Sequence, residues 1–382
     1  MTERNTHSVG IVKTLKLTFA ENGDPLLLEN SQKISPVTVA YETYGELSDT
    51  RDNAILIVHA LSGDAHVAGY HSESDRKPGW WDIMVGPGKP VDTNRYFVIC
   101  SNVLGGCQGT TGPSSNDSAT RKPYGVRFPV VTIGDMVEVQ KRLLDSLGIN
   151  RLHSVMGGSM GGMQVLEWVM KYPDIPKSAI VIASCAALSA QAIAFDAVGR
   201  SAITSDPAWN AGDYYDTDSR IPGLAVARML GHITYLSEAG MRDRFGRKLK
   251  ESGDYAYEFR DEFEIETYLA YKGSSFLDRF DANTYLYVTK AMDYFDAGAK
   301  YGNGSLVEAF RNVKAKMFFV SFTSDWLFPS RQSVEMVRSA EQAGKRVSYL
   351  NIDTPYGHDS FLLPCDRLFS GVQSFLSHVD ME

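Results

Sequence analysis

The chain has 382 residues, of which 43% are hydrophobic and 22% charged, a composition that supplies a packed core and argues against disorder. Its formal net charge of −8 disfavours nucleic acid and anionic membranes as partners, since both are negative. The polar segment 1–13, four cysteines without a Cys-x-x-Cys pair and the lack of an apolar run of about 18 residues favour a cytoplasmic protein with no signal peptide and no membrane span.

Two stretches near the N-terminus alternate apolar and polar residues. The apolar positions are Val12, Leu15, Leu17 and Phe19 in the first stretch, and Val37, Val39, Tyr41 and Thr43 in the second. Alternation of this kind is typical of antiparallel strands with one face in water. We therefore expect the chain to begin with such strands.

Short continuous apolar runs follow, which is the pattern of parallel strands buried on both faces. They cover residues 54–58, 96–100, 154–156, 179–183, 317–320 and 347–352. Helical periodicity lies between or after them, at 136–147, 163–170 and 368–376. Strands that alternate with helices predict an α/β fold, with a mostly parallel sheet covered by helices.

The segment 186–310 breaks this rhythm, because it is rich in aromatic residues, mostly helical in period and free of a strand-like run. We expect a helical cap here, inserted into a core formed by 1–185 plus 311–382. The segment contains a basic patch at 242–250 and an acidic stretch at 251–266. We interpret both as solvated helix faces, and a phosphate-binding role for the basic patch is the alternative.

Gly157-Gly158-Ser159-Met160-Gly161 matches the pattern Gly-x-Ser-x-Gly between an apolar strand and an amphipathic helix. This setting indicates a nucleophile elbow, in which a sharp turn lifts the serine hydroxyl to the N-terminus of the helix. Small residues are needed, because larger side chains would collide with the strand or helix. The chain is therefore expected to have the α/β-hydrolase fold, with Ser159 as nucleophile and a plain glycine-rich turn as the alternative.

A serine hydroxyl needs a base, and in this fold the chain order is serine, acid, histidine. His358 follows the strand at 347–352, whereas His378 lies in a terminal helix. Asp325 follows the strand at 317–320 and is expected to orient the imidazole. Asp353 is a rival acid, although it lies very near the strand that precedes the histidine.

An oxyanion hole requires two backbone N–H groups. We expect them from Met160, directly after the nucleophile, and from Leu61, in the loop after the strand at 54–58. His59, His66 and His71 lie close together in sequence. Their spacing fits no helical pair of ligands, so no metal site is expected.

Several longer strings carry a family resemblance, and they lie in order from about residue 38 to 363. They are His-Ala-Leu-Ser-Gly-Asp-Ala-His at 59–66, Gly-Trp-Trp-Asp at 79–82, Asn-Val-Leu-Gly-Gly-Cys at 102–107, Gly-Thr-Thr-Gly-Pro at 109–113, the elbow at 157–162, Ala-Arg-Met at 227–229, Gly-His-Ile-Thr-Tyr at 231–235 and Gly-His-Asp at 357–359. With them the chain resembles homoserine O-acyltransferases of the α/β-hydrolase type.

The resemblance implies acyl transfer from acyl-CoA to L-homoserine in methionine biosynthesis, by a ping-pong route through an acyl-serine. It also implies that Arg228 and Asp359 bind homoserine, whose carboxylate and ammonium need a cation and an anion. The co-substrate is acyl-CoA, and no permanently bound cofactor is implied. The resemblance further implies a homodimer formed through the cap helices.

Three alternatives remain at this stage. A homoserine O-succinyltransferase would need a cation near the acyl group, and the loop at 325–328 supplies none, which favours acetyl-CoA. A serine esterase would have the same fold and triad. A binding or signalling protein would be expected to have lost the nucleophile or the base, and both are present.

Overall fold

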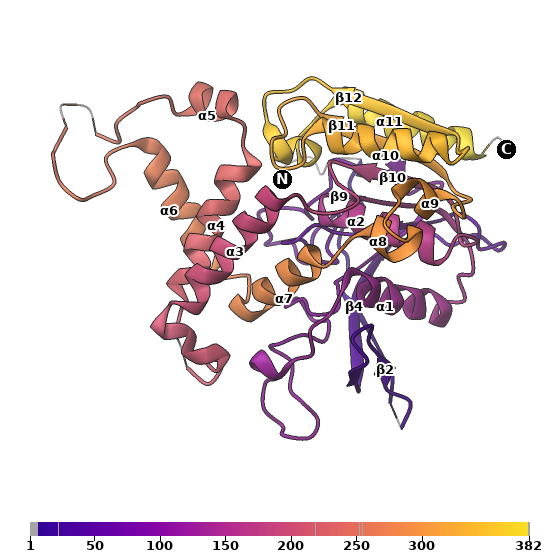
Figure 1. Cartoon of the computed structure of the whole chain (residues 1–382), viewed down its shortest axis with the longest axis horizontal. Coiled ribbons are helices and arrows are strands. Elements are labelled where there is room, and N and C mark those ends of the chain that lie inside the picture. Colours follow the sequence, from indigo (N-terminus) through magenta and orange to yellow (C-terminus); the bar gives the residue numbers. More distant parts are fainter. Residues whose placement is uncertain (1–6, 22, 218, 252, 254, 381–382) are drawn as a thin grey trace.

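The computed structural model describes residues 7–21, 23–217, 219–251, 253 and 255–380 (Figure 1). Its centre is a sheet of eight strands, in the order β1-β4-β8-β5-β9-β10-β11-β12. The strands are β1 (Leu15–Phe19), β4 (Val37–Tyr44), β8 (Phe97–Ser101), β5 (Ala54–Ile57), β9 (Leu152–Gly158), β10 (Pro176–Ile182), β11 (Lys316–Phe322) and β12 (Val347–Ile352). The pairs β1–β4 and β4–β8 are antiparallel, and every pair from β8 to β12 is parallel.

The six apolar runs of the sequence are all confirmed as strands, and β12 has the expected bounds. The central strands β5 and β9 are buried along their whole length. The expectation of one wet face is wrong for β4, where six of eight residues are buried. The reason is that the loop 63–71 covers the face of β4 that carries Glu42, which contacts His66 and His71 there.

Helices cover both faces of the sheet. Side chains of α1 (Ile133–Ser146), α2 (Met160–Lys171) and α10 (Ser330–Gln342) pack in one apolar cluster with one set of alternate strand residues. Side chains of α11 (Asp366–Asp380) pack in a second cluster with the other set. Alternate residues of a strand point to opposite faces of the sheet. Helices α1, α2 and α10 therefore lie on one face and α11 on the other.

The remaining small elements lie in the connections. Two short pairs of strands, β2 (Leu26–Leu27) with β3 (Lys33–Ile34) and β6 (Val85–Gly86) with β7 (Val91–Asp92), lie outside the main sheet. The 3-10 helices of the described residues are η1 (Gly125–Arg127), η2 (Pro207–Gly212) and η3 (Gly357–Leu362). In the described part of the chain, no helix combines the length and apolarity that crossing a bilayer requires.

Within the described residues, seven α-helices lie between β10 and β11, in addition to η2. They are α3 (Ala190–Thr204), α4 (Pro222–Tyr235), α5 (Glu238–Arg244), α6 (Glu264–Phe276), α7 (Ala282–Asp293), α8 (Ala297–Gly302) and α9 (Leu306–Phe310). Figure 1 shows α3 to α6 standing beside the sheet, and residues of α3, α4, α6 and α7 share an apolar cluster of their own. Other residues of α7, together with α8 and α9, join the core. The division at 186–310 stays a proposal, with α3 to α6 as the part clear of the sheet.

The interpretation of the charged stretch 242–266 as two solvated helix faces is wrong for most of its length. Helix α5 ends at Arg244 and α6 begins at Glu264. Between them the described residues form turns and loops, with a single bridge between Leu249 and Phe263. The cause lies in the composition, because Gly246, Gly253 and a dense run of charges give a helix little to bury.

Candidate active site

Ser159 lies at the turn between β9 and α2, where the sequence predicts the nucleophile elbow. Its backbone has φ 58° and ψ −126°, a conformation that costs energy in a residue with a side chain. The neighbouring glycines are needed sterically: a Cβ on Gly161 would lie 2.3 Å from the carbonyl oxygen of Val58, and one on Gly157 would lie 2.5 Å from the same atom. The strain and the crowding are those of a nucleophile elbow.

His358 and Asp325 are in direct contact, as the sequence predicts for a catalytic base and its acid. His358 lies in η3, Asp325 follows β11, and Nδ1 of the histidine is 2.8 Å from Oδ2 of the aspartate. Both side chains are buried. Burial lowers the pKa of His358, but the charge and hydrogen bond of Asp325 outweigh it and leave that pKa above its usual value. The rival acid Asp353 instead accepts a hydrogen bond from the hydroxyl of Thr323.

The nucleophile lines one small cavity, and the base packs against a residue of its wall. Ser159, Leu61 and Phe328 are among the residues that line this cavity, which has a volume of about 40 Å³. The Phe328 ring stacks on the imidazole of His358 at a centroid distance of 4.9 Å. Among the described contacts, no hydrogen bond links Ser159 Oγ to His358. Catalytic hydrogen bonds often tighten only when substrate binds, so proton transfer between the two stays a proposal.

The backbone N–H groups of Leu61 and Met160 donate to no protein acceptor within the described part of the chain. The loop that carries Leu61 is fixed by His59: its Nε2 accepts from Val103 N at 3.1 Å, and its Nδ1 lies 2.8 Å from Ala60 O. These partners make His59 a neutral imidazole protonated on Nδ1, and burial lowers its pKa. The histidine therefore holds the predicted oxyanion loop in place.

The two residues implied for homoserine lie on the cap side of the triad. Arg228, on α4, places Nη1 3.3 Å from Ser62 Oγ and its guanidinium over the ring of Phe276. Asp359 directly follows His358. Burial raises the pKa of the Asp359 carboxyl, whereas the charges of His358 and Arg228 lower it in part, so the guanidinium and the carboxylate lie within each other's field.

The structure contains an acidic pair beside the cavity that was not predicted from the sequence. Asp196, on α3, lines the cavity and lies within hydrogen-bonding range of Asp293 on α7. Burial and the charge of Asp293 raise the pKa of Asp196 to about 8. Arg200, one turn after Asp196, binds Asp293 at 2.6 Å. The only signal in the sequence was the i,i+4 spacing of Asp196 and Arg200 on a helix, which is common on solvated surfaces.

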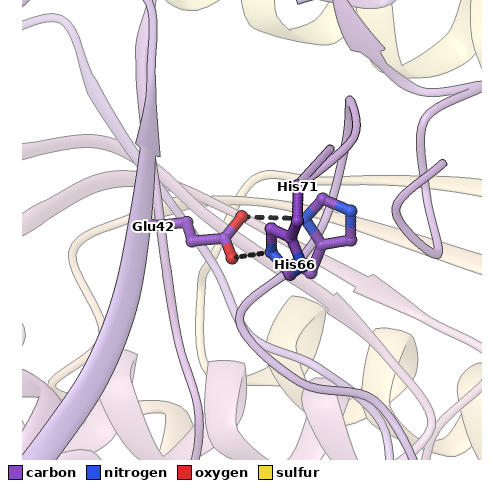
Figure 2. Close-up of side chains that lie close together, drawn as sticks. All are labelled: Glu42, His66 and His71. Atoms are coloured by element: carbon purple, nitrogen blue, oxygen red, sulfur yellow. Dashed lines mark hydrogen bonds and ion pairs between the residues drawn. The ribbon is translucent and has the colours of Figure 1, made fainter. Parts of the chain in front are cut away.

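A second buried carboxylate gathers two histidines at the far edge of the oxyanion loop (Figure 2). Glu42 Oε2 is 2.9 Å from His66 Nδ1, and Oε1 is 2.7 Å from His71 Nε2. Their ligand atoms lie within 4.8 Å of one another, the spacing of a metal site. However, Thr14 and Tyr44 also donate to the carboxylate, so four donors fill its acceptor positions. The cluster is complete as a hydrogen-bonded network.

Comparison with known proteins finds similar sequences of known family. A family model described as alpha/beta hydrolase fold matches residues 53–364, which confirms the predicted fold. The homoserine O-acetyltransferase of Solidesulfovibrio magneticus is 52% identical over 370 residues, covering 97% of this chain and 93% of the relative. That of Methanohalobium evestigatum is 54% identical, covering 97% and 74%.

The similar solved structures include both a transferase and an esterase. The homoserine O-acetyltransferase of Bacillus anthracis superposes with a TM-score of 0.89 at 32% identity, covering 96% of this chain and 98% of its own. The structure of esterase E22 superposes with a TM-score of 0.87 at 31% identity, covering 96% and 100%. A transferase and a hydrolase thus share this backbone, and the backbone alone does not separate the two activities.

Proposed function

The chain belongs to the homoserine O-acetyltransferase family of the α/β-hydrolase fold, and from this premise we propose that it transfers the acetyl group of acetyl-CoA to the hydroxyl of L-homoserine, a step of methionine biosynthesis. The observation that carries the proposal is that nearly the full length of this chain matches two homoserine O-acetyltransferases, with about half of all aligned residues identical. The contact between His358 and Asp325 supports the chemistry, since it activates a serine nucleophile.

The first half-reaction forms an acyl-serine. His358 takes the proton of Ser159, and Oγ attacks the thioester carbonyl. The tetrahedral oxyanion is held by the N–H groups of Leu61 and Met160, which have no other acceptor in the described part of the chain. The thiol of CoA leaves with a proton from His358, and the acetyl group stays on Ser159.

The second half-reaction transfers the acetyl group to homoserine. Arg228 binds the substrate's carboxylate and Asp359 binds its ammonium, which directs the hydroxyl towards His358. The base takes the hydroxyl proton, the alkoxide attacks the acyl-serine, and Ser159 recovers its proton as O-acetylhomoserine forms. The bound alcohol must reach the acyl-enzyme before water does, and this is where a transferase and an esterase differ.

The acetyl donor is favoured over succinyl by the cavity beside Ser159. A succinyl group carries a second carboxylate, which is costly to bury without a cation. The described residues that line the cavity include no lysine or arginine, and Asp196 is the one carboxylic acid among them.

A homodimer formed through the cap helices is part of the proposal. Helices α3 and α4 expose Ile193, Val198, Val226 and Ile233, apolar side chains that association would bury. A cytoplasmic location is proposed as well. It is consistent with four free cysteines, since a reducing compartment keeps thiols reduced. Light scattering of the purified protein tests the oligomeric state.

The deciding experiment measures release of CoA thiol from acetyl-CoA and from succinyl-CoA, each with and without homoserine. We expect rapid release only with acetyl-CoA and homoserine together, with O-acetylhomoserine as product. Ser159→Ala is the matched control and should form no covalent acetyl-protein. Release that ignores homoserine and yields acetate would identify an esterase and overturn the proposal.

A further inference from the structure

The cap carries a group of basic side chains whose charge exceeds what homoserine needs. Four of them, Arg228 on α4, Arg244 on α5, Lys272 on α6 and Arg279 just after α6, are called the cationic row below. The carboxylate of homoserine requires one cation, and Arg228 supplies it in the proposed mechanism. The other three have no role in that reaction.

Two aromatic rings of α6 hold the row together. The guanidinium carbons of Arg228 and Arg279 lie 4.5 Å and 5.2 Å from the centre of the Phe276 ring. Arg244 Cζ and Lys272 Nζ lie 4.7 Å and 5.5 Å from the centre of the Tyr268 ring. The two rings are eight residues apart on one helix, which corresponds to about 12 Å at ~1.5 Å per residue. The charges therefore form a line rather than a point.

One end of the row contacts the oxyanion loop. Arg279 Nη1 donates to the carbonyl oxygen of Ser62 at 3.0 Å, and Arg228 Nη1 lies 3.3 Å from the hydroxyl of the same residue. Ser62 directly follows Leu61, which lines the cavity of Ser159. From there the row follows α6 away from the nucleophile, towards α5.

The row has no carboxylate in direct contact within the described part of the chain, although Asp359 lies within the field of Arg228 and Lys272. Within the described residues, none of its four members forms an ion pair with a carboxylate, whereas the nearby Arg242 binds Glu238 at 2.9 Å. Burial and the neighbouring Arg228 and Lys77 lower the pKa of Lys272, and burial and Arg228 lower that of Arg279. The cations thus destabilise one another's charge, in a chain whose net charge is −8. A bound polyanion would relieve this repulsion.

We propose that the cationic row binds the phosphate groups of acyl-CoA, with Lys272 and Arg244 as the residues that contribute most. This inference rests on the proposed acetyl transfer. Acyl-CoA carries its thioester and its phosphates at opposite ends of a flexible arm. A thioester at Ser159 therefore leaves the phosphates outside the small cavity, and the row begins at Ser62, next to the cavity-lining Leu61, and follows α6 from there. Guanidinium and ammonium groups are the usual partners of phosphates.

The test compares two acetyl donors. Acetyl-CoA carries the phosphates, and S-acetyl-N-acetylcysteamine keeps the thioester without them. Lys272→Met and Arg244→Gln remove one charge each and preserve much of the side-chain volume. We expect each to raise KM for acetyl-CoA about tenfold, the effect of one lost charge-assisted contact, with kcat within about twofold. Arg242→Gln is the control. Arg242 lies on α5, like Arg244, but its side chain is exposed and already paired with Glu238.

The truncated donor separates binding from folding. With it, Lys272→Met and Arg244→Gln should lose no more than the Arg242→Gln control, because there are no phosphates to bind. Adenosine 3′,5′-bisphosphate should compete with acetyl-CoA in the wild type and more weakly in the variants, whereas inorganic phosphate at equal concentration should compete poorly. Raising the salt concentration should increase KM for acetyl-CoA, and less so in the double variant.

Two results would overturn the inference. One is an unchanged KM for acetyl-CoA in both variants, and the other is an equal loss with the two donors. Either result leaves the proposed function standing, as long as the wild type still acetylates homoserine. Failure of the proposed function is a different observation, namely a wild-type enzyme whose CoA release does not depend on homoserine.

Discussion

Asp325 uses its two carboxylate oxygens for two separate purposes, and only one of them involves His358. Oδ2 lies 2.8 Å from His358 Nδ1, whereas Oδ1 accepts the backbone N–H groups of Leu327 and Phe328 at 3.0 and 2.9 Å. The backbone bonds fix the carboxylate, and the carboxylate fixes the imidazole. The ring of Phe328 then closes the arrangement by stacking on the histidine.

Asp325→Asn should lower kcat for acetyl transfer by roughly 10³- to 10⁴-fold, since the imidazole loses its orienting charge and its correct tautomer. The amide oxygen can still accept the two backbone N–H groups, so the free energy of unfolding should change by less than about 1 kcal/mol. Steady-state kinetics and urea denaturation measure the two quantities. A variant with near-normal kcat would show that Asp325 does not orient the base.

The pH profile should report the raised pKa of His358. Deprotonated imidazole is the active form, so kcat/KM should fall as the pH drops below this pKa. Because Asp325 holds that pKa above its usual value of 6.5, the fall should begin at a higher pH than for an ordinary histidine. In Asp325→Asn the residual activity should persist to lower pH. An unshifted profile in this variant would contradict the assignment.

Glu42→Gln should destabilise the fold by about 2–3 kcal/mol, because an amide nitrogen would face one of the four donors that now bind the carboxylate. Burial raises the pKa of Glu42, but the hydrogen bonds of His66, His71, Thr14 and Tyr44 outweigh it and lower the pKa to about 2. The folded state thus binds fewer protons than the unfolded one, and this stability is present above pH ~4.5 and lost as the pH falls towards 2.

Urea denaturation at pH 7 and pH 3 measures this effect, and the difference between wild type and Glu42→Gln should shrink at the lower pH. The same cluster should not depend on a metal. Added EDTA or Zn²⁺ should leave the wild-type melting temperature unchanged, because the carboxylate is already satisfied. A rise of several degrees with Zn²⁺ would identify a metal site at Glu42, His66 and His71.

Gly161→Ala should destabilise the protein by about 2–4 kcal/mol and reduce its soluble yield. The new methyl group would lie 2.3 Å from the carbonyl oxygen of Val58, a backbone atom that cannot move aside without disturbing β5 and the loop after it. Gly371→Ala, on α11, is the control: its closest contact is a leucine side chain at 3.2 Å, and the gain in helix propensity offsets it. Equal stability of the two variants would contradict the crowding at the elbow.

Asp196→Asn should stabilise the fold, by on the order of 2 kcal/mol at pH 9 and by less at pH 5. Burial and Asp293 raise the pKa of Asp196 to about 8, so the folded state binds a proton that the unfolded state has released above pH ~4. Wild-type stability therefore declines as the pH rises from 4 to 8, and the amide variant lacks this decline. Thermal melts across that range measure it, and parallel curves would contradict a protonated Asp196.

The sequence predicted the strands and the elbow well for a physical reason. A parallel strand buried on both faces must be apolar along its length, so 54–58 and 154–156 have few alternatives. Gly-x-Ser-x-Gly between strand and helix is similarly constrained by steric crowding. The chain order of serine, acid and histidine then left few candidates for the base, and His358 does contact Asp325.

What the sequence could not give depends on contacts between distant segments. The alternating pattern of β4 suggested that Glu42 faces solvent. Its partners His66 and His71 come from a later loop, so the pattern of the strand alone does not reveal them. Asp196 meets Asp293 only when α3 packs against α7. The cationic row combines residues of three cap elements around two rings, and only Arg244 belonged to the basic patch seen at 242–250. Neither periodicity nor local spacing encodes such encounters.

The long segment 183–315 between β10 and β11 has a consequence for the order of folding. The nucleophile is built by residues up to 182, whereas its acid and base arrive only after the whole segment 183–315 has been synthesised. Until β11 pairs with it, β10 is an unprotected apolar edge that can template aggregation. A nascent or truncated chain that stops within the cap thus exposes an aggregation-prone sheet edge, and its Ser159 still lacks both the acid and the base. Catalytic competence and protection of that edge are acquired together, when β11 docks.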